Sequence, residues 1–453
     1  MSVVSTLPPP GAPRDAEIPR AVERRLDNGL RVIAFEQRNL PLISAQLFVR
    51  CGAAAERDEE AGLSALTAAL LMQGTQRRSA PELAAAVDAL GARLDAGSGY
   101  DASVVTVSAT TPAFPAAFAL LDEVARLPAF AEHEVERVRA KSISDLALTY
   151  ANPSAVARLV AQRTAYGDAP YGHPLAGTPE TLATLDRARI GAFHAAFYRP
   201  DDAALVIGGD LTIEEAFALA QRELGGWAAP NAPIARPAER AIPAPRSRIV
   251  VVDKPDAGRT ALAAGRIAIE RRSPDYYAGV VATAVLSGYS GRLNTEVRVK
   301  RGLSYGAAAA LAPRRLPGLF LATTLVDHAR VAEATQVVRD AIRSLVAAPP
   351  SDEDLQSRKA VVTGAFYRGI ETIDGLASQL ADHVLYDVPL EELQAYPARV
   401  QTIDAARVVE FAARVLVEDA FVVLAGDAAK FEPALAATHG EIEHVPAPSA
   451  ASA

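Results

Sequence analysis

The sequence predicts an α+β protein of two duplicated halves, each an antiparallel β-sheet with helices packed on one face. Three observations support this prediction. Segments that alternate apolar and polar residues are mixed with long stretches of helical periodicity. Two segments each combine a helix start, an aromatic residue and an apolar strand ending in Gly-Asp, and the pairs Asp186/Asp404 and Gly209/Gly426 have equal separations to within one residue. A proline-rich stretch lies between the halves.

The repeat sets the predicted domain boundaries. The first half covers residues 20–224, a linker covers 225–248, and the second half covers 249–438. The linker is rich in proline, which resists helix formation and favours an extended chain. Its prolines are Pro230, Pro233, Pro237, Pro243 and Pro245.

The elements of the first half follow in order. Asn28-Gly29 predicts a tight hairpin turn, because this pair readily adopts positive φ angles. A strand follows with one apolar face, formed by Ile43, Ala45, Leu47 and Val49.

Helices then dominate the first half. An Ala/Leu-rich helix is expected at residues 62–75, and a second helix at 79–95 with Ser79 as its N-cap. A strand at 102–110 precedes helical patterns through most of 112–197. The second half repeats this order, with a strand in 247–255, helices in 274–286 and a strand at 318–326.

Composition narrows the function classes. The chain has 453 residues and a formal net charge of -8, without a basic stripe of the kind that binds nucleic acid. No apolar run approaches the roughly 20 residues of a membrane span. The first residues lack the pattern of a secretory signal, which favours the cytoplasm for the sequence as given, or the periplasm if a leader was removed.

Residues 62–79, GLSALTAALLMQGTQRRS, resemble the zinc-binding helix of the pitrilysin or insulinase-like metallopeptidases. That family places His-x-x-Glu-His two residues after the glycine, whereas this sequence has Ala65, Ala68 and Ala69. Methyl groups can neither bind Zn²⁺ nor activate water. The resemblance places the family's further carboxylate ligand at Asp145, or at Leu146 if the register shifts by one. We therefore expect a degenerate metal site and no zinc in this chain.

Residues 287–309, SGYSGRLNTEVRVKRGLSYGAAA, resemble the second signature of the same family. In its active members, an Arg and a Tyr at the positions of Arg298 and Tyr305 bind substrate near the scissile carbonyl. Taken alone, either residue could serve a structural role. Val299 replaces the usual acidic residue, and the strand after Tyr305 is unusually rich in alanine. Gly302 suits the left-handed residue that ends a helix.

A third passage, YGHPLAGTPETL at residues 171–182, also resembles a loop of this family. His173 precedes Pro174 in a predicted turn, so we expect a structural hydrogen bond rather than a metal ligand.

The layout is most similar to the mitochondrial processing peptidase branch. This resemblance implies a noncatalytic, substrate-binding subunit of a heterodimeric zinc endopeptidase that hydrolyses peptides. A homologous partner would hold the zinc, and this chain would supply Arg298 and Tyr305. Two alternatives are a scaffold subunit like the core proteins of respiratory complexes, and a peptide-binding protein without catalysis.

Overall fold

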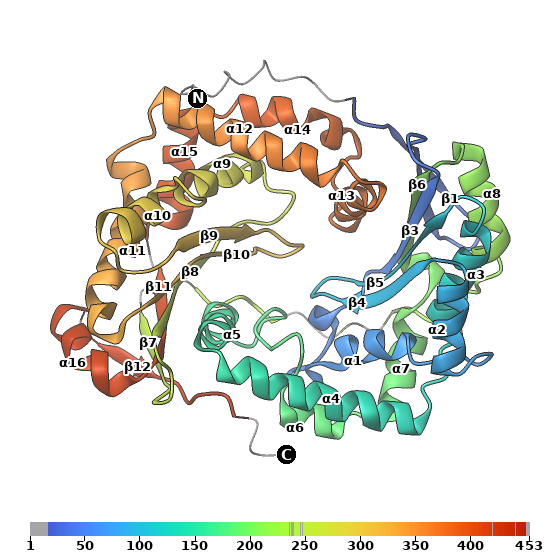
Figure 1. The fold of residues 1–453 in the computed structure, drawn as a ribbon, viewed down its shortest axis with the longest axis horizontal. Helices are drawn as coiled ribbons and strands as arrows, with labels where there is room; N and C mark the ends of the chain where they lie inside the picture. Colours follow the sequence, from blue (N-terminus) through green and yellow to red (C-terminus); the bar gives the residue numbers. More distant parts are fainter. Residues whose placement is uncertain are drawn as a thin grey trace, which may run out of the picture.

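The computed structural model describes residues 17–234, 236, 240–244, 246, 248–418, 420–439 and 441–449. Two six-stranded sheets and their helices form two halves, which confirms the predicted α+β class and duplicated plan. In the view of Figure 1 the halves close into a ring.

The first sheet consists of β1 (Ala21–Arg25), β2 (Arg31–Glu36), β3 (Leu42–Val49), β4 (Arg93–Ser98), β5 (Ser103–Thr110) and β6 (Ala203–Gly209). The second consists of β7 (Ile249–Asp253), β8 (Thr260–Ile267), β9 (Ala307–Ala312), β10 (Leu319–Val326), β11 (Phe421–Gly426) and β12 (Ile442–His444).

The helices of the first half are α1 (Leu63–Leu71), α2 (Ala80–Ala89), α3 (Phe114–Arg126), α4 (Glu132–Ala151), α5 (Pro153–Tyr166), α6 (Pro179–Thr184), α7 (Arg187–Phe197) and α8 (Ile213–Leu224). Those of the second are α9 (Tyr276–Leu286), α10 (Arg292–Asn294), α11 (Val331–Ala347), α12 (Asp352–Gly369), α13 (Ile373–Leu385), α14 (Glu391–Gln401), α15 (Ala405–Phe411) and α16 (Ala428–His439).

Five strands of each sheet follow the same order, and the sixth differs, because β1 pairs with β2 antiparallel whereas β12 pairs with β7 in parallel. Their strand orders are β1-β2-β6-β3-β5-β4 and β12-β7-β11-β8-β10-β9. The predicted antiparallel pairing needs a correction, because β2 pairs with β6, and β7 with β11, in parallel. Each pair joins a strand near the start of its half to one near its end, and the long connection of strands and helices between them permits parallel pairing. The sheets are therefore mixed, and they leave β4 and β9 as edges on the inner side of the ring (Figure 1).

Local sequence patterns account for several elements. Gly29 has a φ of 93° in the turn between β1 and β2, as predicted, whereas Asn28 has no positive φ, so the turn at residues 26–30 is longer than the tight hairpin expected. The predicted apolar face of β3 lies in the core of the first half. Ser79 caps α2, and its backbone N–H donates to Glu82 over 2.8 Å. The helix predicted at 79–95 is too long, because Gly91 takes a φ of 57° and the chain then enters β4.

One helix from each half packs on the sheet of the other half, and we call these two the exchanged helices. Helix α5 of the first half packs on β8 and β11, and helix α13 of the second half packs on β3 and β6. Figure 1 shows both helices on the inner side of the ring. The predicted placement of helices on one face is therefore incomplete, since an exchanged helix covers part of each opposite face.

The segment between the halves contacts the first half. Its described residues, within 225–248, form no helix or strand, while Pro237 and Pro245 lie outside the described residues. The Arg199 guanidinium donates to the carbonyls of Pro230 and Ala232 over 3.1 and 2.7 Å. These bonds hold the start of the segment against the strand-rich core.

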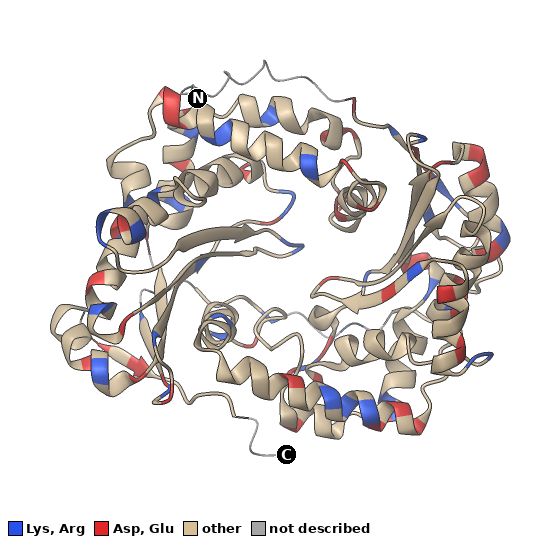
Figure 2. Ribbon diagram, viewed as in Figure 1, with Lys and Arg blue, Asp and Glu red and all other residues tan. Residues whose placement is uncertain are grey.

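Charges of both signs are interspersed on outer helices such as α4 and α11 (Figure 2). This mixture differs from the one-sided basic face of many nucleic-acid-binding proteins. None of the helices in the described ranges has both the length and the apolar character of a bilayer span.

Candidate functional site

Helix α1 contains the three alanines that stand where the metallopeptidases it resembles place their zinc ligands. Gly62 precedes it with a φ of 95°, a conformation that favours glycine. The leucines predicted to pack this helix are all buried in the core of the first half, as Leu63, Leu66, Leu70 and Leu71. The helix therefore remains a structural element of the fold.

Buried carboxylates hold both ends of α1. The Glu56 carboxylate accepts hydrogen bonds from the backbone N–H groups of Gly62 and Ser64, over 2.9 and 2.5 Å. Such contacts satisfy N–H groups that have no partner within the helix. After the helix, the hydroxyl of buried Thr75 donates to the carboxylate of Glu123. These contacts fix the helix independently of any metal.

The residues on α1 do not fit a zinc ion. Ala68 is buried, whereas Ala65 and Ala69 are partly buried, and none carries a donor atom. Within the described ranges, no group of three or more His, Cys, Asp or Glu side chains is arranged to hold a metal. A catalytic zinc site ordinarily needs about three protein ligands. This helix offers packing surface instead.

Asp145 and Leu146, the two candidates for the position of the further carboxylate ligand, lie on different sides of α4. Asp145 faces solvent, with 57% of its side chain exposed, and pairs with Lys141 over 2.6 Å. Leu146 is 5% exposed and lies in the core that contains Leu66 and Leu70 of α1. The assignment of Asp145 to the degenerate metal site is therefore wrong in geometry, and Leu146 occupies the inward position.

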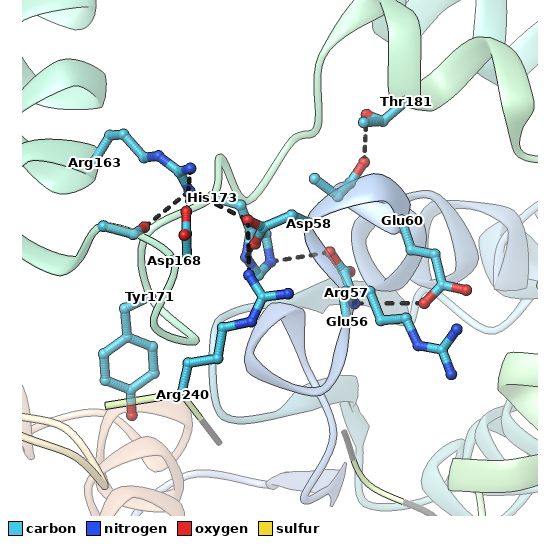
Figure 3. A network of polar contacts seen from close by, with 12 residues as sticks. Glu56, Arg57, Asp58, Glu60, Arg163, Asp168, Tyr171, His173, Thr181 and Arg240 are labelled. Atoms are coloured by element: carbon cyan, nitrogen blue, oxygen red, sulfur yellow. Dashed lines mark hydrogen bonds and ion pairs between the residues drawn. The ribbon is translucent and has the colours of Figure 1, made fainter. Parts of the chain in front are cut away.

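His173 lies in a buried polar cluster beside α1 (Figure 3). Its Nε2 lies 3.3 Å from Glu56 Oε2, and its Nδ1 lies 3.7 Å from Asp58 Oδ1. Neither ring nitrogen makes a hydrogen bond, so the hydrogen bond expected from the sequence is wrong. The hydroxyl of Tyr100 donates to the His173 carbonyl over 3.0 Å, and burial raises the pKa of Tyr100, which keeps this donor protonated. The cluster links the loop of His173 to the start of α1 through Glu56.

Arg298 and Tyr305 lie on the second half. Arg298 belongs to the π-helical segment Thr295–Lys300 that continues α10, and Gly302 then takes a φ of 58°, as predicted for a left-handed helix end. Tyr305 lies two residues before β9. Both side chains are exposed, Tyr305 by 82%, and no hydrogen bond or ion pair joins either to another described residue. Both are therefore available to an external ligand.

Two further residues accompany this pair. The Arg298 guanidinium lies 5.3 Å from the ring centroid of Tyr289, and the Arg259 guanidinium lies 5.2 Å from that of Tyr305. Both distances are within the range of a cation–π contact. The sequence did not single out Tyr289, although it lies within the second signature, or Arg259, which lies outside that signature. Arg298 and Tyr305 therefore each have one cation–π partner within the second half.

Two family profiles match the chain. The one described as "Insulinase (Peptidase family M16)" matches residues 31–179, and the one described as "Peptidase M16 inactive domain" matches residues 184–362. Together they span most of both halves.

Curated relatives are similar over most of the chain. An uncharacterized zinc protease of Mycobacterium leprae is 24% identical over 356 residues, 78% of this chain and 80% of the relative. One from Streptomyces coelicolor is 23% identical over 376 residues, 78% of each chain. Human cytochrome b-c1 complex subunit 1 is 25% identical over 209 residues, 46% of this chain and 43% of that subunit.

Solved structures share the fold. The peptidase M16 inactive domain from Pseudomonas fluorescens has a TM-score of 0.84 at 24% identity, covering 90% of this chain and 98% of the other. A protease from Helicobacter pylori has a TM-score of 0.84 at 18% identity, covering 90% and 100%.

Proposed function

The chain belongs to the M16 family of peptidases, and we propose that it is the noncatalytic, substrate-binding subunit of a heterodimeric zinc endopeptidase. A homologous partner with an intact His-x-x-Glu-His helix would hold the zinc ion, which supplies an activated water when bound. This chain would supply Arg298 and Tyr305. The names of the bacterial relatives as zinc proteases support the reaction class.

One contrast within the chain carries the proposal. The zinc-site helix α1 is filled with alanine and packed by leucine, whereas Arg298 and Tyr305 are exposed and without polar partners among the described residues. If Arg298 and Tyr305 served mainly to pack the fold, their side chains would be buried to a greater extent. A chain that retains substrate-binding groups without metal ligands suits a subunit that complements another.

The chemistry of the pair suits peptide binding. A guanidinium presents several N–H donors in a fixed plane, and a phenol donates one hydrogen bond. Both can donate to carbonyl oxygens of a peptide and to an oxygen that gains negative charge during hydrolysis. The cation–π contacts with Tyr289 and Arg259 restrict the motion of both groups. Such restriction lowers the entropic cost of binding.

The test compares the chain alone with the chain mixed with a zinc-bearing homologue. We expect zinc and peptide cleavage only in the mixture. Arg298→Ala and Tyr305→Phe should each lower kcat/KM by about 100-fold, the size of a lost oxyanion donor, without dissociating the pair. Lys300→Ala is the control, because Lys300 is a neighbouring exposed cation paired with Glu296. Unchanged turnover in both variants would contradict the proposal.

A scaffold role is the second candidate. The similarity to human cytochrome b-c1 complex subunit 1 over 209 residues favours it. This candidate predicts stable co-purification with other subunits of a large assembly, and no change in any activity after Arg298→Ala. A soluble pair that cleaves peptides would exclude it.

A further inference from the structure

A groove lies between the exchanged helix α5 and the inner edge of the second sheet. It has a volume of about 310 Å³, and we call it the α5–β9 groove. Its lining comes from α5, β8, β9 and β10, with Gly306 at the start of β9. Helix α5 packs mainly on β8 and β11 and contacts β10 less, which leaves the face of β9 largely open. The volume is at the lower end of the range for ligand sites, about 300–1,000 Å³.

Small side chains form the floor of the groove. Ala308 of β9 pairs with Thr323 of β10, and Thr323 pairs with Ala263 of β8, so these residues lie in one row on the same face. Ala308 is exposed, and its strand is an edge with one side unpaired. The alanine-rich stretch after Tyr305 therefore creates space and leaves the backbone accessible.

Arg158 is the charged residue that lines this groove. It is exposed, and it makes no hydrogen bond or ion pair with any residue in the described ranges. Arg163, five residues further along α5, provides a contrast because it pairs with Asp58 and Asp168. A guanidinium without a carboxylate partner, beside neutral Ala, Thr and Ser side chains, is complementary to an anionic ligand.

The groove adjoins the position at which substrate would bind. Gly306 follows Tyr305 directly and lines the groove. The Thr324 hydroxyl donates to the Gly306 carbonyl over 2.9 Å, which holds the start of β9 in place. A peptide whose backbone reaches Tyr305 can therefore place a neighbouring group in the groove.

We propose that the α5–β9 groove binds a carboxylate of the peptide substrate, and that Arg158 determines this specificity. The carboxylate would come from an Asp or Glu side chain or from the end of the peptide. This inference rests on the proposed substrate-binding role, but it concerns a residue that the family signatures do not include. Arg158 acts as a specificity residue and not in the reaction itself.

The test measures binding to the isolated full-length chain by fluorescence polarisation. The probes are labelled short peptides that differ at one point: an amidated peptide with an internal Glu, the same peptide with Gln, and the Gln peptide with a free carboxyl end. We expect the Glu probe, the free-end probe or both to bind about ten-fold more tightly than the amidated Gln probe, as for one charge-assisted hydrogen bond. The Glu probe and the free-end probe distinguish the two sources of the carboxylate.

Variants then assign the preference to the groove. Arg158→Gln should abolish it, and Arg158→Glu should reverse it in favour of a Lys peptide, a gain that misfolding cannot imitate. Ala308→Leu should weaken binding of every probe by filling the floor. Arg222→Gln is the control, because it removes the same charge from exposed α8. Equal binding of all probes to the wild-type chain, or a preference that survives Arg158→Gln, would overturn the inference.

The outcome separates this inference from the proposed function. Loss of turnover in Arg298→Ala without a carboxylate preference would support the complementing subunit and reject the groove. A preference that depends on Arg158, in a chain that never supports cleavage, would retain the groove and reject the catalytic role.

Discussion

Because helix α13 packs on the first sheet, a substitution in α13 should lower the unfolding free energy of the first half by an amount that can be estimated. Leu380 of α13 is fully buried, in a core that also contains Ile33, Phe48 and Val206 of the first sheet. Leu380→Ala removes three buried carbons, the Cγ methine and the two methyl groups, and leaves a cavity in this interface. Comparable substitutions cost about 2–5 kcal/mol, and we expect about 3 kcal/mol here because both α13 and the sheet are well packed.

A single fluorophore can report this effect. Trp227 is the one tryptophan in the sequence, and it is buried in the core of the first half. Urea unfolding followed by its fluorescence therefore monitors the first half, although Leu380 belongs to the second. With a urea m value of about 3 kcal/mol/M, the midpoint should fall by about 1 M.

The matched control is Leu148→Ala on α4. Leu148 is 74% exposed, so the same change in side chain should alter stability by less than about 0.5 kcal/mol. If Leu380→Ala leaves the Trp227 midpoint at the wild-type value, α13 does not stabilise the first sheet. The reasoning about exchanged helices would then be refuted.

Three further outcomes are expected from thermal and urea unfolding. Leu146→Ala should cost about 3 kcal/mol, whereas Asp145→Asn should cost less than about 0.5 kcal/mol because its pair with Lys141 is exposed; similar losses would contradict the inward position of Leu146. His173→Ala should cost about 3 kcal/mol by leaving a cavity where the buried ring packs, and a wild-type melting temperature would contradict this. Burial lowers the pKa of His383, so this side chain binds a proton more readily in the unfolded chain than in the folded one. The free energy of unfolding should therefore fall as the pH drops below about 6.5, the pKa of an unfolded histidine. This dependence of stability on pH should weaken in His383→Gln, and an unchanged dependence would show that other groups cause it.

Several features could be predicted because they depend on neighbouring residues. The turn at Asn28-Gly29 follows from backbone sterics, and the face of β3 follows from alternation along one strand. The two similar segments begin at Asp186 and Asp404, and both residues cap helices in the structure, at α7 and α15. The loss of zinc ligands is readable from the side chains themselves.

Other predictions failed because local pattern competes with longer-range contacts. The helix expected at 79–95 ends early, since Gly91 breaks it and the following residues gain sheet partners in β5. The ring nitrogens of His173 make no hydrogen bond, although they lie 3.3 and 3.7 Å from carboxylate oxygens of Glu56 and Asp58. The Glu56 carboxylate instead accepts from backbone N–H groups at the start of α1, a contact that the local sequence does not indicate.

The sequence by itself determined the class of fold, the duplication and the degenerate helix, and it marked Arg298 and Tyr305 as candidates for substrate binding. Only the tertiary structure decided the exchange of α5 and α13, the inward position of Leu146, and the groove at Arg158. The physical reason is that periodicity records which face of an element is apolar, but not which distant element covers it. Arg158 lies on a first-half helix, and it becomes a candidate binding residue because that helix packs on the sheet of the second half.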